Sequence, residues 1–130
     1  MVIPHTEGFG TSLLGKEIDV KFTHLFSQKT IELFPSVHAH GFAGDALMLN
    51  HLVLEAGATP PAHAHSHEQI TLVLRGELEL TIEDEKHVFK PGDVVAIPGN
   101  AKHAAKAITE TELVEVFTPV REDLVERFGV

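Results

Sequence analysis

From Lys29 onward the sequence divides into short apolar runs, each bounded by glycine, proline or another turn-forming residue. The runs are TIELF, ALMLNHLVLEAG, several between Gln69 and Gly99, and TELVEVFTP. Apolar runs of this length between turn signals are typical of β-strands. Many short strands joined by tight turns favour a β-sandwich or a small barrel over an open sheet. We therefore expect an all-β fold.

One run shows the alternation of a strand that has a single buried face. Leu78, Leu80 and Ile82 alternate with polar residues, so their side chains would share the face that packs on a core. The polar residues that follow, Glu83 to Lys86, predict the tip of a hairpin.

The two ends of the chain differ from its middle. Residues 1–28 have no clear period: GFGTSLLG predicts a loop, and Ile18 to Phe22 predicts a possible edge strand. At the other end, Leu124 and Phe128 are spaced as in one turn of helix, which predicts a short C-terminal helix. A chain of 130 residues suits one domain. We expect an N-terminal extension, residues 1–28, and one domain, residues 29–130.

Composition narrows the function classes. The chain has no cysteine, so any metal must be held by imidazole, carboxylate or amide groups. Its net charge of −9 and the lack of a basic stripe argue against nucleic acid as a partner. The sequence has neither a signal-like apolar start nor a run of about 18 apolar residues, which predicts a cytoplasmic protein with no membrane partner. The net negative charge of the chain would repel an anionic ligand. Such a ligand would therefore need a local cation within roughly 8 to 10 Å to outweigh that repulsion.

Histidines gather in the segment AHAHSHEQ. His63, His65, His67 and Gln69 have the same parity on an extended chain, so they could present their polar atoms to one point. His103, which follows the turn PGN, is a further candidate. Three imidazoles and an oxygen donor suit a divalent manganese, iron, nickel, copper or zinc ion. The alternative is that these histidines are solvated in a loop rich in proline and alanine.

The spacing of these residues resembles that of single-domain cupins. The first cupin signature is G-x5-HxH-x3/4-E-x6-G, and glutamine stands here where glutamate is usual. The second is G-x5-PxG-x2-H-x3-N, and here Asn100 replaces the second glycine and Ala107 the final asparagine. Asn100 is a mild departure, because asparagine tolerates a left-handed turn. The matching positions are Gly57, His63, His65, Gln69 and Gly76, then Gly92, Pro98 and His103.

The resemblance implies a double-stranded β-helix, a small jelly-roll barrel. It implies further that four side chains surround one divalent transition metal at the barrel mouth: His63, His65, Gln69 and His103. In that family the position of His67 lies away from the metal, which suggests a pocket-lining role. Glu68 has the parity of the opposite face, so it would be a ligand only if a bulge turned it.

The other histidines carry no such signature. His38 and His40 form a second HxH pair without a following glutamate or glycine at the signature distance, so we expect pocket or surface residues. His51 is expected to be a hydrogen-bonded core or pocket residue. Three more are expected to be solvated: His5, His24 and His87.

Among cupins, the segments HAHSHEQ and FTPVREDL are similar to those of the KdgF-type pectin-degradation cupins, over roughly Leu47 to Leu124. Those proteins linearise the unsaturated uronate released from pectin and alginate. The resemblance implies that Arg121 binds the sugar carboxylate, Phe117 floors the pocket and Glu115 transfers a proton. Glutamate replaces that family's aspartate at the last position, so the substrate could differ.

Each of these residues also has a simpler interpretation. Glu115 could be a solvated strand carboxylate and Phe117 a core residue. Arg121 could form a salt bridge beside Glu122 and Asp123, at the start of the predicted helix.

The sequence thus predicts a metal-dependent enzyme that acts without redox chemistry on an unsaturated uronate or a similar acidic sugar. A neutral glutamine ligand leaves more positive charge on the metal than glutamate would, which favours Lewis acid chemistry on an anion. The alternatives are a metal-dependent dioxygenase or lyase of the cupin superfamily, and a ligand-binding cupin without catalysis. The resemblance also implies a homodimer, because small cupins often dimerise by pairing or packing sheets, which would cover exposed strand edges.

Overall fold

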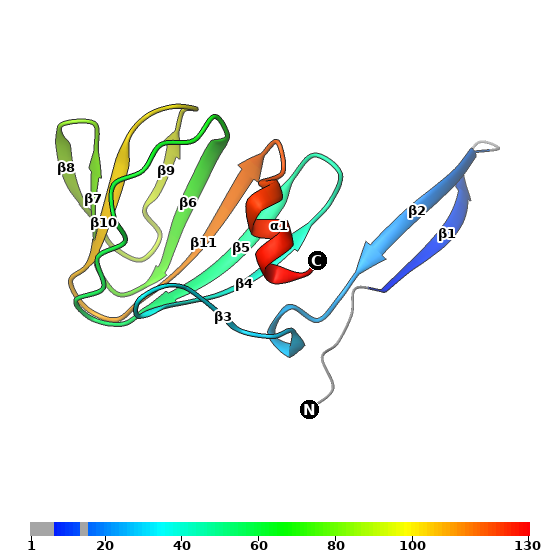
Figure 1. The fold of residues 1–130 in the computed structure, drawn as a ribbon, viewed down its shortest axis with the longest axis horizontal. Helices are drawn as coiled ribbons and strands as arrows, with labels where there is room; N and C mark the ends of the chain where they lie inside the picture. Colours follow the sequence, from blue (N-terminus) through cyan, green and yellow to red (C-terminus); the bar gives the residue numbers. More distant parts are fainter. Residues whose placement is uncertain (1–6, 14–15) are drawn as a thin grey trace.

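The computed structural model describes residues 7–13 and 16–130, which form a small β-barrel with one helix against its side and a hairpin extending from it (Figure 1). The predictions of an all-β jelly roll and of a short C-terminal helix are confirmed. The elements in chain order are β1 (Glu7–Leu13), β2 (Lys16–Phe22), a 3-10 helix (Leu25–Ser27), β3 (Ile31–Phe34), β4 (Val37–Ala43), β5 (Met48–Leu54), β6 (Glu68–Arg75), β7 (Leu78–Ile82), β8 (Glu85–Phe89), β9 (Val94–Ile97), β10 (His103–Ala107), β11 (Thr111–Thr118) and α1 (Glu122–Phe128).

Two antiparallel sheets make up the barrel. The larger sheet has the strand order β3-β4-β5-β11-β6-β9, and the smaller has the order β10-β7-β8. They face each other, and a pair of main-chain hydrogen bonds joins them at one end: His63 and His103 each donate an N–H to the carbonyl oxygen of the other at 2.9 Å. The backbone itself therefore holds the segment before β6 against β10 at the histidines.

The core lies between the sheets and follows the period of the strands. In β4 the residues Val37 and Ala39 point inward and are fully buried. His38 and His40 alternate with them and point to the outer face. Phe117 on β11 is 1% exposed and is the largest fully buried side chain. Burial of such apolar surface is the main source of stability for a sheet pair.

Turn residues explain how the strands are connected. Gly57, Gly76 and Gly92 have positive φ angles of 85°, 88° and 90°, and a Cβ at Gly76 would overlap the carbonyl oxygen of Glu110. Asn100 has a φ of 70°, so asparagine does adopt the left-handed conformation here. The turns at these four positions need residues that tolerate a positive φ angle. Glycine and asparagine therefore stand at the fixed points of the sequence where these turns occur.

Helix α1 closes one side of the barrel. Its residue Leu124 is buried, and Gly129 ends it with a φ of 71°. Arg127 donates hydrogen bonds to the carbonyl oxygens of Leu33 at 3.1 Å and Glu32 at 3.0 Å. These bonds fix the helix to β3, and its first residues reach the mouth of the barrel.

The N-terminal segment is folded differently from the expectation. Most of GFGTSLLG lies in β1 and not in a loop, because β1 pairs along its length with β2 to form a hairpin. Ile18 to Phe22 is a strand, as predicted, but its partner is β1 and this pair forms its own two-stranded sheet. The two strands are held together by the hydrogen bonds between them, and the hydrophobic period of the sequence gives no sign of such pairing. His5 lies outside the described residues. The division at residues 28 and 29 stays a prediction.

Within the described ranges, no helix is long and apolar enough to span a membrane.

Candidate functional site

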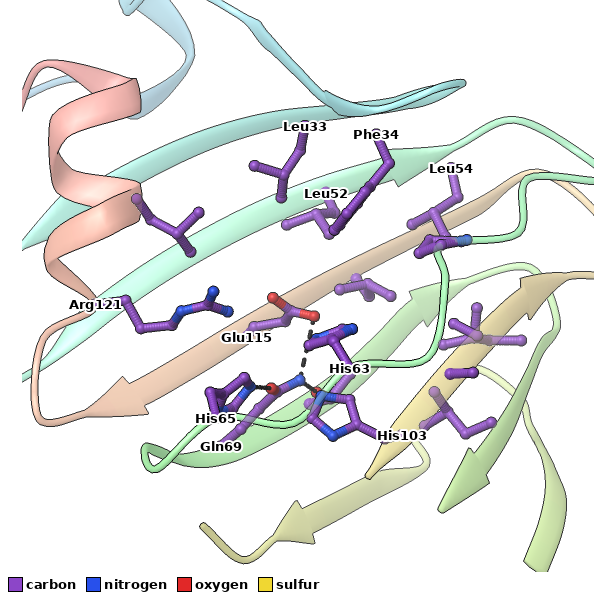
Figure 2. A pocket seen from close by; sticks show the side chains of 18 of the residues that line it. Leu33, Phe34, Leu52, Leu54, His63, His65, Gln69, His103, Glu115 and Arg121 are labelled. Atoms are coloured by element: carbon purple, nitrogen blue, oxygen red, sulfur yellow. Dashed lines mark hydrogen bonds between the residues drawn. The ribbon is translucent and has the colours of Figure 1, made fainter. Parts of the chain in front are cut away.

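A cavity of about 320 Å³ lies inside the barrel, between the two sheets and α1 (Figure 2). Its polar side chains come from several elements: the segment before β6, then β6, β10, β11 and the start of α1. Six of the residues that carry them were predicted site residues or ligands: His63, His65, Gln69, His103, Glu115 and Arg121. A cavity of this size can hold a small molecule.

Three imidazoles meet in this cavity. The ligand nitrogens of His63, His65 and His103 all lie within 4.8 Å of one another, and within the described ranges no other group of three or more histidine or acidic side chains meets this condition. The ring centroids of His63 and His103 are 4.3 Å apart, and those of His65 and His103 are 5.0 Å apart. The backbone bridge between His63 and His103 brings residues 40 positions apart in the sequence into this cluster.

The backbone fixes which nitrogen of each ring carries the proton. Each Nδ1 lies 2.9 to 3.0 Å from a main-chain carbonyl oxygen, which can only accept a hydrogen bond. Nδ1 is therefore the protonated nitrogen, and each Nε2 keeps its lone pair. The pairs are His63 with Pro61, His65 with His67, and His103 with Ala101.

Burial favours the neutral, metal-binding form of two of these rings, those of His65 and His103. It lowers the pKa of His65, and the positive charges of Arg121 and of a protonated His103 would lower it further. Burial also lowers the pKa of His103, although the hydrogen bond to Ala101 opposes this effect. Neutral imidazoles with free Nε2 atoms are ready to act as ligands at neutral pH.

Gln69 completes the arrangement. Its side chain is buried, and its Nε2 donates to Thr71 Oγ1 at 2.8 Å and to Glu115 Oε1 at 3.3 Å. These two bonds turn its Oε1 toward His65 Nε2, at a distance of 3.1 Å. Because His65 Nδ1 already carries the proton, these two atoms are both acceptors, and a cation beside them would remove their repulsion.

The residues present thus fit a metal ion. Among the described residues, His103 Nε2 is buried without a hydrogen-bond partner, which a ligand bond would satisfy. Neighbouring ligand atoms about 2 Å from one ion lie roughly 3 Å apart, close to the separation of His65 Nε2 and Gln69 Oε1. Three nitrogens and an amide oxygen suit a first-row divalent ion.

Glu115 lies on the inner face of β11, and its carboxyl group points into the cavity between Gln69 and Arg121 (Figure 2). Burial raises the pKa of Glu115 to about 7, and the charge of Arg121 limits this rise. A carboxyl group of this kind beside a ligand cavity is suited to accept and return protons. It is not the solvated strand residue of the simpler interpretation.

Arg121 precedes α1, and its side chain is only 17% exposed. Its Nη2 donates to Asp123 Oδ2 at 2.9 Å, and its guanidinium carbon lies 5.3 Å from the centre of the Phe117 ring. Its Nε atom is buried without a hydrogen-bond partner in the described structure. The salt bridge of the simpler interpretation therefore exists, and Arg121 also keeps a donor free beside the cavity.

Phe117 lies in the core beside the site residues. It does not line the cavity, because it points from β11 into the core, where it is 1% exposed. Its ring packs edge-on against His65 with 5.7 Å between centroids, and Arg121 lies over it. Phe117 thus packs against two site residues, and its role as the floor of the pocket stays a prediction.

A cupin domain model matches residues 50–118. The chain belongs to the cupin family. The pectin degradation protein KdgF of Dickeya dadantii is 34% identical over 83 residues, which is 62% of this chain and 76% of that protein.

Two solved cupin structures agree with this assignment. KdgF from Halomonas sp. is 27% identical, with a TM-score of 0.72 over 76% of this chain and 93% of that one. An RmlC-like cupin from Shewanella frigidimarina is 26% identical, with a TM-score of 0.76 over 80% and 95% of the two chains. The protein is therefore a KdgF-like cupin.

The other histidines within the described ranges do not line the cavity. His67 is half-buried, with its ring 5.6 Å from that of His65, and it does not line the cavity. Three histidines occupy the outer face of the larger sheet, each with its own partner: His38 with Glu55, His40 with Thr30, and His51 with Glu112. His24 and His87 are exposed, and so is Glu68.

Sequence reasoning missed three polar residues that line the cavity: Thr71, Asp123 and Arg127. Thr71 could have been found, because it shares the strand parity of Gln69. Asp123 and Arg127 could not, because their places depend on how α1 packs against the barrel.

Proposed function

We propose that this KdgF-like cupin is a metal-dependent enzyme that shifts a proton, without redox chemistry, on an unsaturated uronate or a similar small acid. The observation that carries the proposal is one cavity with three clustered imidazoles whose Nδ1 atoms face main-chain carbonyl oxygens, a buried carboxyl group and a guanidinium with a free donor. The name of the Dickeya relative, a pectin degradation protein, supports an acidic sugar as the first substrate to test.

The proposed roles follow from the geometry. His63, His65, Gln69 and His103 would hold the ion, which would supply Lewis acidity toward an oxygen of the substrate. Arg121 would bind the substrate carboxylate through its free Nε and the edge of its guanidinium. Glu115 lies between the metal-binding residues and Arg121. Its carboxyl group would therefore reach substrate atoms held at either place.

Glu115 would carry the proton in the conversion of an enol to a ketone. Its carboxylate takes the proton of the enol O–H, and that electron pair becomes the carbonyl π bond. The electrons of the C=C bond then take the same proton from the Glu115 carboxylic acid. No electron leaves the substrate, so the step needs no oxidant.

The test uses the protein with its natural metal. Elemental analysis after purification without added metal identifies the ion among zinc, nickel, manganese, iron and copper. The loaded protein is then incubated with 4,5-unsaturated galacturonate, and loss of the enol-ether absorbance is followed. We expect faster loss than in buffer and no oxygen uptake. No acceleration would exclude this substrate, and oxygen uptake would favour a dioxygenase instead.

We further propose that two copies associate through the outer face of the larger sheet. Leu49, Ile70 and Val94 on this face are 37%, 47% and 59% exposed. Two rows across the sheet hold only apolar side chains and histidines: Phe42, Leu49, Val116, Ile70 and Ala96, and then His40, His51, Val114, Leu72 and Val94. Since the chain carries a net charge of −9, two copies would repel least where these two rows, which hold no carboxylate, face each other.

Light scattering after gel filtration tests this interface. We expect the wild type to be a dimer and Ile70→Lys to be a monomer. A monomeric wild type would contradict the proposal.

A further inference from the structure

The cavity has two unlike walls. One carries the metal-binding residues with Glu115 and Arg121, as described above. The wall on the other side of the Glu115 carboxyl is built from apolar side chains of β3 and β5 (Figure 2). Its residues are Leu33, Phe34, Leu52 and Leu54, and Leu78 and Leu80 from β7 extend it.

This apolar wall offers no polar side chain to a ligand. Two polar lining residues at the helix side of the cavity already have partners. Arg127 uses two nitrogens on the carbonyl oxygens of β3, and Asp123 binds Arg121. A ligand hydroxyl on this side would therefore lose its bonds to water and gain no partner.

An apolar group in the same place would gain from contact with the wall. Leu33 and Leu52 are 9% and 5% exposed, so they are sheltered from bulk solvent and yet line the cavity. Phe34 stands where the two walls meet, with its ring 6.3 Å from that of His63. Apolar ligand surface that enters such a space leaves water, which favours binding.

We propose that the acid bound by this site has an apolar body, such as a branched alkyl, alicyclic or aryl group, on the side away from its carboxylate. Its carboxylate lies at Arg121, an oxygen lies toward the histidines, and the apolar group lies against Leu33, Leu52 and Phe34. This inference rests on the proposed function for the acid-binding end of the site. It narrows the substrate class, because a bare polyhydroxylated uronate has no apolar group to place against this wall.

The test compares two acids that share a six-membered ring and a carboxylate. Cyclohexanecarboxylate has no hydroxyl groups, and galacturonate has several. Calorimetry with the metal-loaded protein measures both dissociation constants. We expect cyclohexanecarboxylate to bind about 10-fold more tightly or better. Equal binding, tighter binding of galacturonate, or no binding of either acid would overturn the inference.

Two matched variants on β5 locate the preference. Leu52→Asn replaces an inward leucine by a polar residue of similar size, and we expect it to remove most of the preference. Leu49→Asn makes the same change on the outer face of the strand and is expected to keep it. Should Leu52→Asn fail to fold, Leu33→Gln at the β3 wall replaces it, and the wild-type comparison remains decisive.

The two proposals fail in different ways. Turnover of unsaturated galacturonate together with tighter binding of galacturonate would overturn the apolar-body inference and leave the proposed function standing. Tighter binding of cyclohexanecarboxylate without turnover of unsaturated galacturonate would overturn the uronate substrate and leave the inference standing.

Discussion

Two HxH pairs in this cupin have the same spacing and different surroundings. In the pair His63 and His65, each Nδ1 faces a main-chain carbonyl oxygen and each Nε2 points toward the cavity. In the pair His38 and His40, each Nε2 is taken by a side chain on the outer face, Glu55 at 2.9 Å or Thr30 at 3.0 Å. Spacing alone places two imidazoles on one face. What their nitrogens already contact decides whether they are available to a metal.

The third histidine of each group shows the same difference. His103 joins the inner pair with a buried and unpartnered Nε2. His51 lies opposite His40 in the register of the outer face, but its Nε2 is 2.8 Å from Glu112 Oε2. The ring of Phe26 packs edge-on against both His40 and His51, at 5.7 and 4.9 Å between centroids. The outer group is thus held together by packing and hydrogen bonds and leaves little room for an ion.

The largest effect is expected from removing one inner histidine. His103→Ala should weaken metal binding by more than about 100-fold, because even residues that only orient a ligand contribute roughly 10- to 100-fold. Competitive titration with a chelating indicator measures this change. His40→Ala is the control and should leave metal affinity and stoichiometry unchanged. A comparable loss in both variants would show that the outer pair also takes part.

A change at Glu115 separates catalysis from metal binding. Glu115→Gln should reduce the turnover of unsaturated galacturonate by about 10²- to 10⁴-fold, because the amide cannot carry the proton. Metal affinity should change little, since the substitution keeps an acceptor oxygen for Gln69 Nε2. Steady-state kinetics and metal titration on the same preparation check both points. Full activity in the variant would assign proton transfer to another group or indicate a binding protein without catalysis.

A change of ligand charge sharpens the comparison further. Gln69→Glu should strengthen metal binding by about 10-fold, because a carboxylate attracts a divalent ion more strongly than an amide does. It should also weaken the binding of carboxylic acids, because less positive charge remains for them. Titration with metal and then with cyclohexanecarboxylate measures both changes. Thr71→Ser, which keeps the hydroxyl acceptor for residue 69, is the control. Weaker metal binding in Gln69→Glu would argue against residue 69 as a ligand.

The smallest effects are expected on the outer face and concern stability. Glu112→Ala should lower the free energy of unfolding by about 1 to 3 kcal/mol, because it leaves the buried His51 Nε2 without its partner. Glu55→Ala removes the exposed partner of His38 and should cost less than about 0.5 kcal/mol. Urea denaturation of the metal-free proteins compares the two. Equal losses would mean that burial of His51 does not make its hydrogen bond more important.

The strands and the candidate ligands were predictable because their signals are local. Alternation gave the buried face of β7, where Leu78 and Leu80 line the cavity. The glycines and Asn100 marked turns that need a positive φ, and their fixed distances from the histidines located the cluster. The role of each ligand stays a prediction until metal is measured.

Other features depend on contacts that the sequence does not display. Strand β1 contains two glycines and no clear alternation, and only its pairing with β2 reveals it. The carbonyl groups that set the ring tautomers belong to Pro61, His67 and Ala101, but a main-chain oxygen is present in every residue and gives no signal. The buried place of Phe117 follows from the packing of Arg121 and His65, which no spacing rule describes.

The mutual main-chain hydrogen bonds between His63 and His103 have a consequence for how such a site can evolve. They hold the two segments together through atoms that every amino acid except proline possesses in full. Replacement of either imidazole would therefore remove a ligand and leave the alignment of the backbone in place. Lineages of this cupin could exchange or abandon their metal while keeping the barrel, so that new chemistry arises without a new fold.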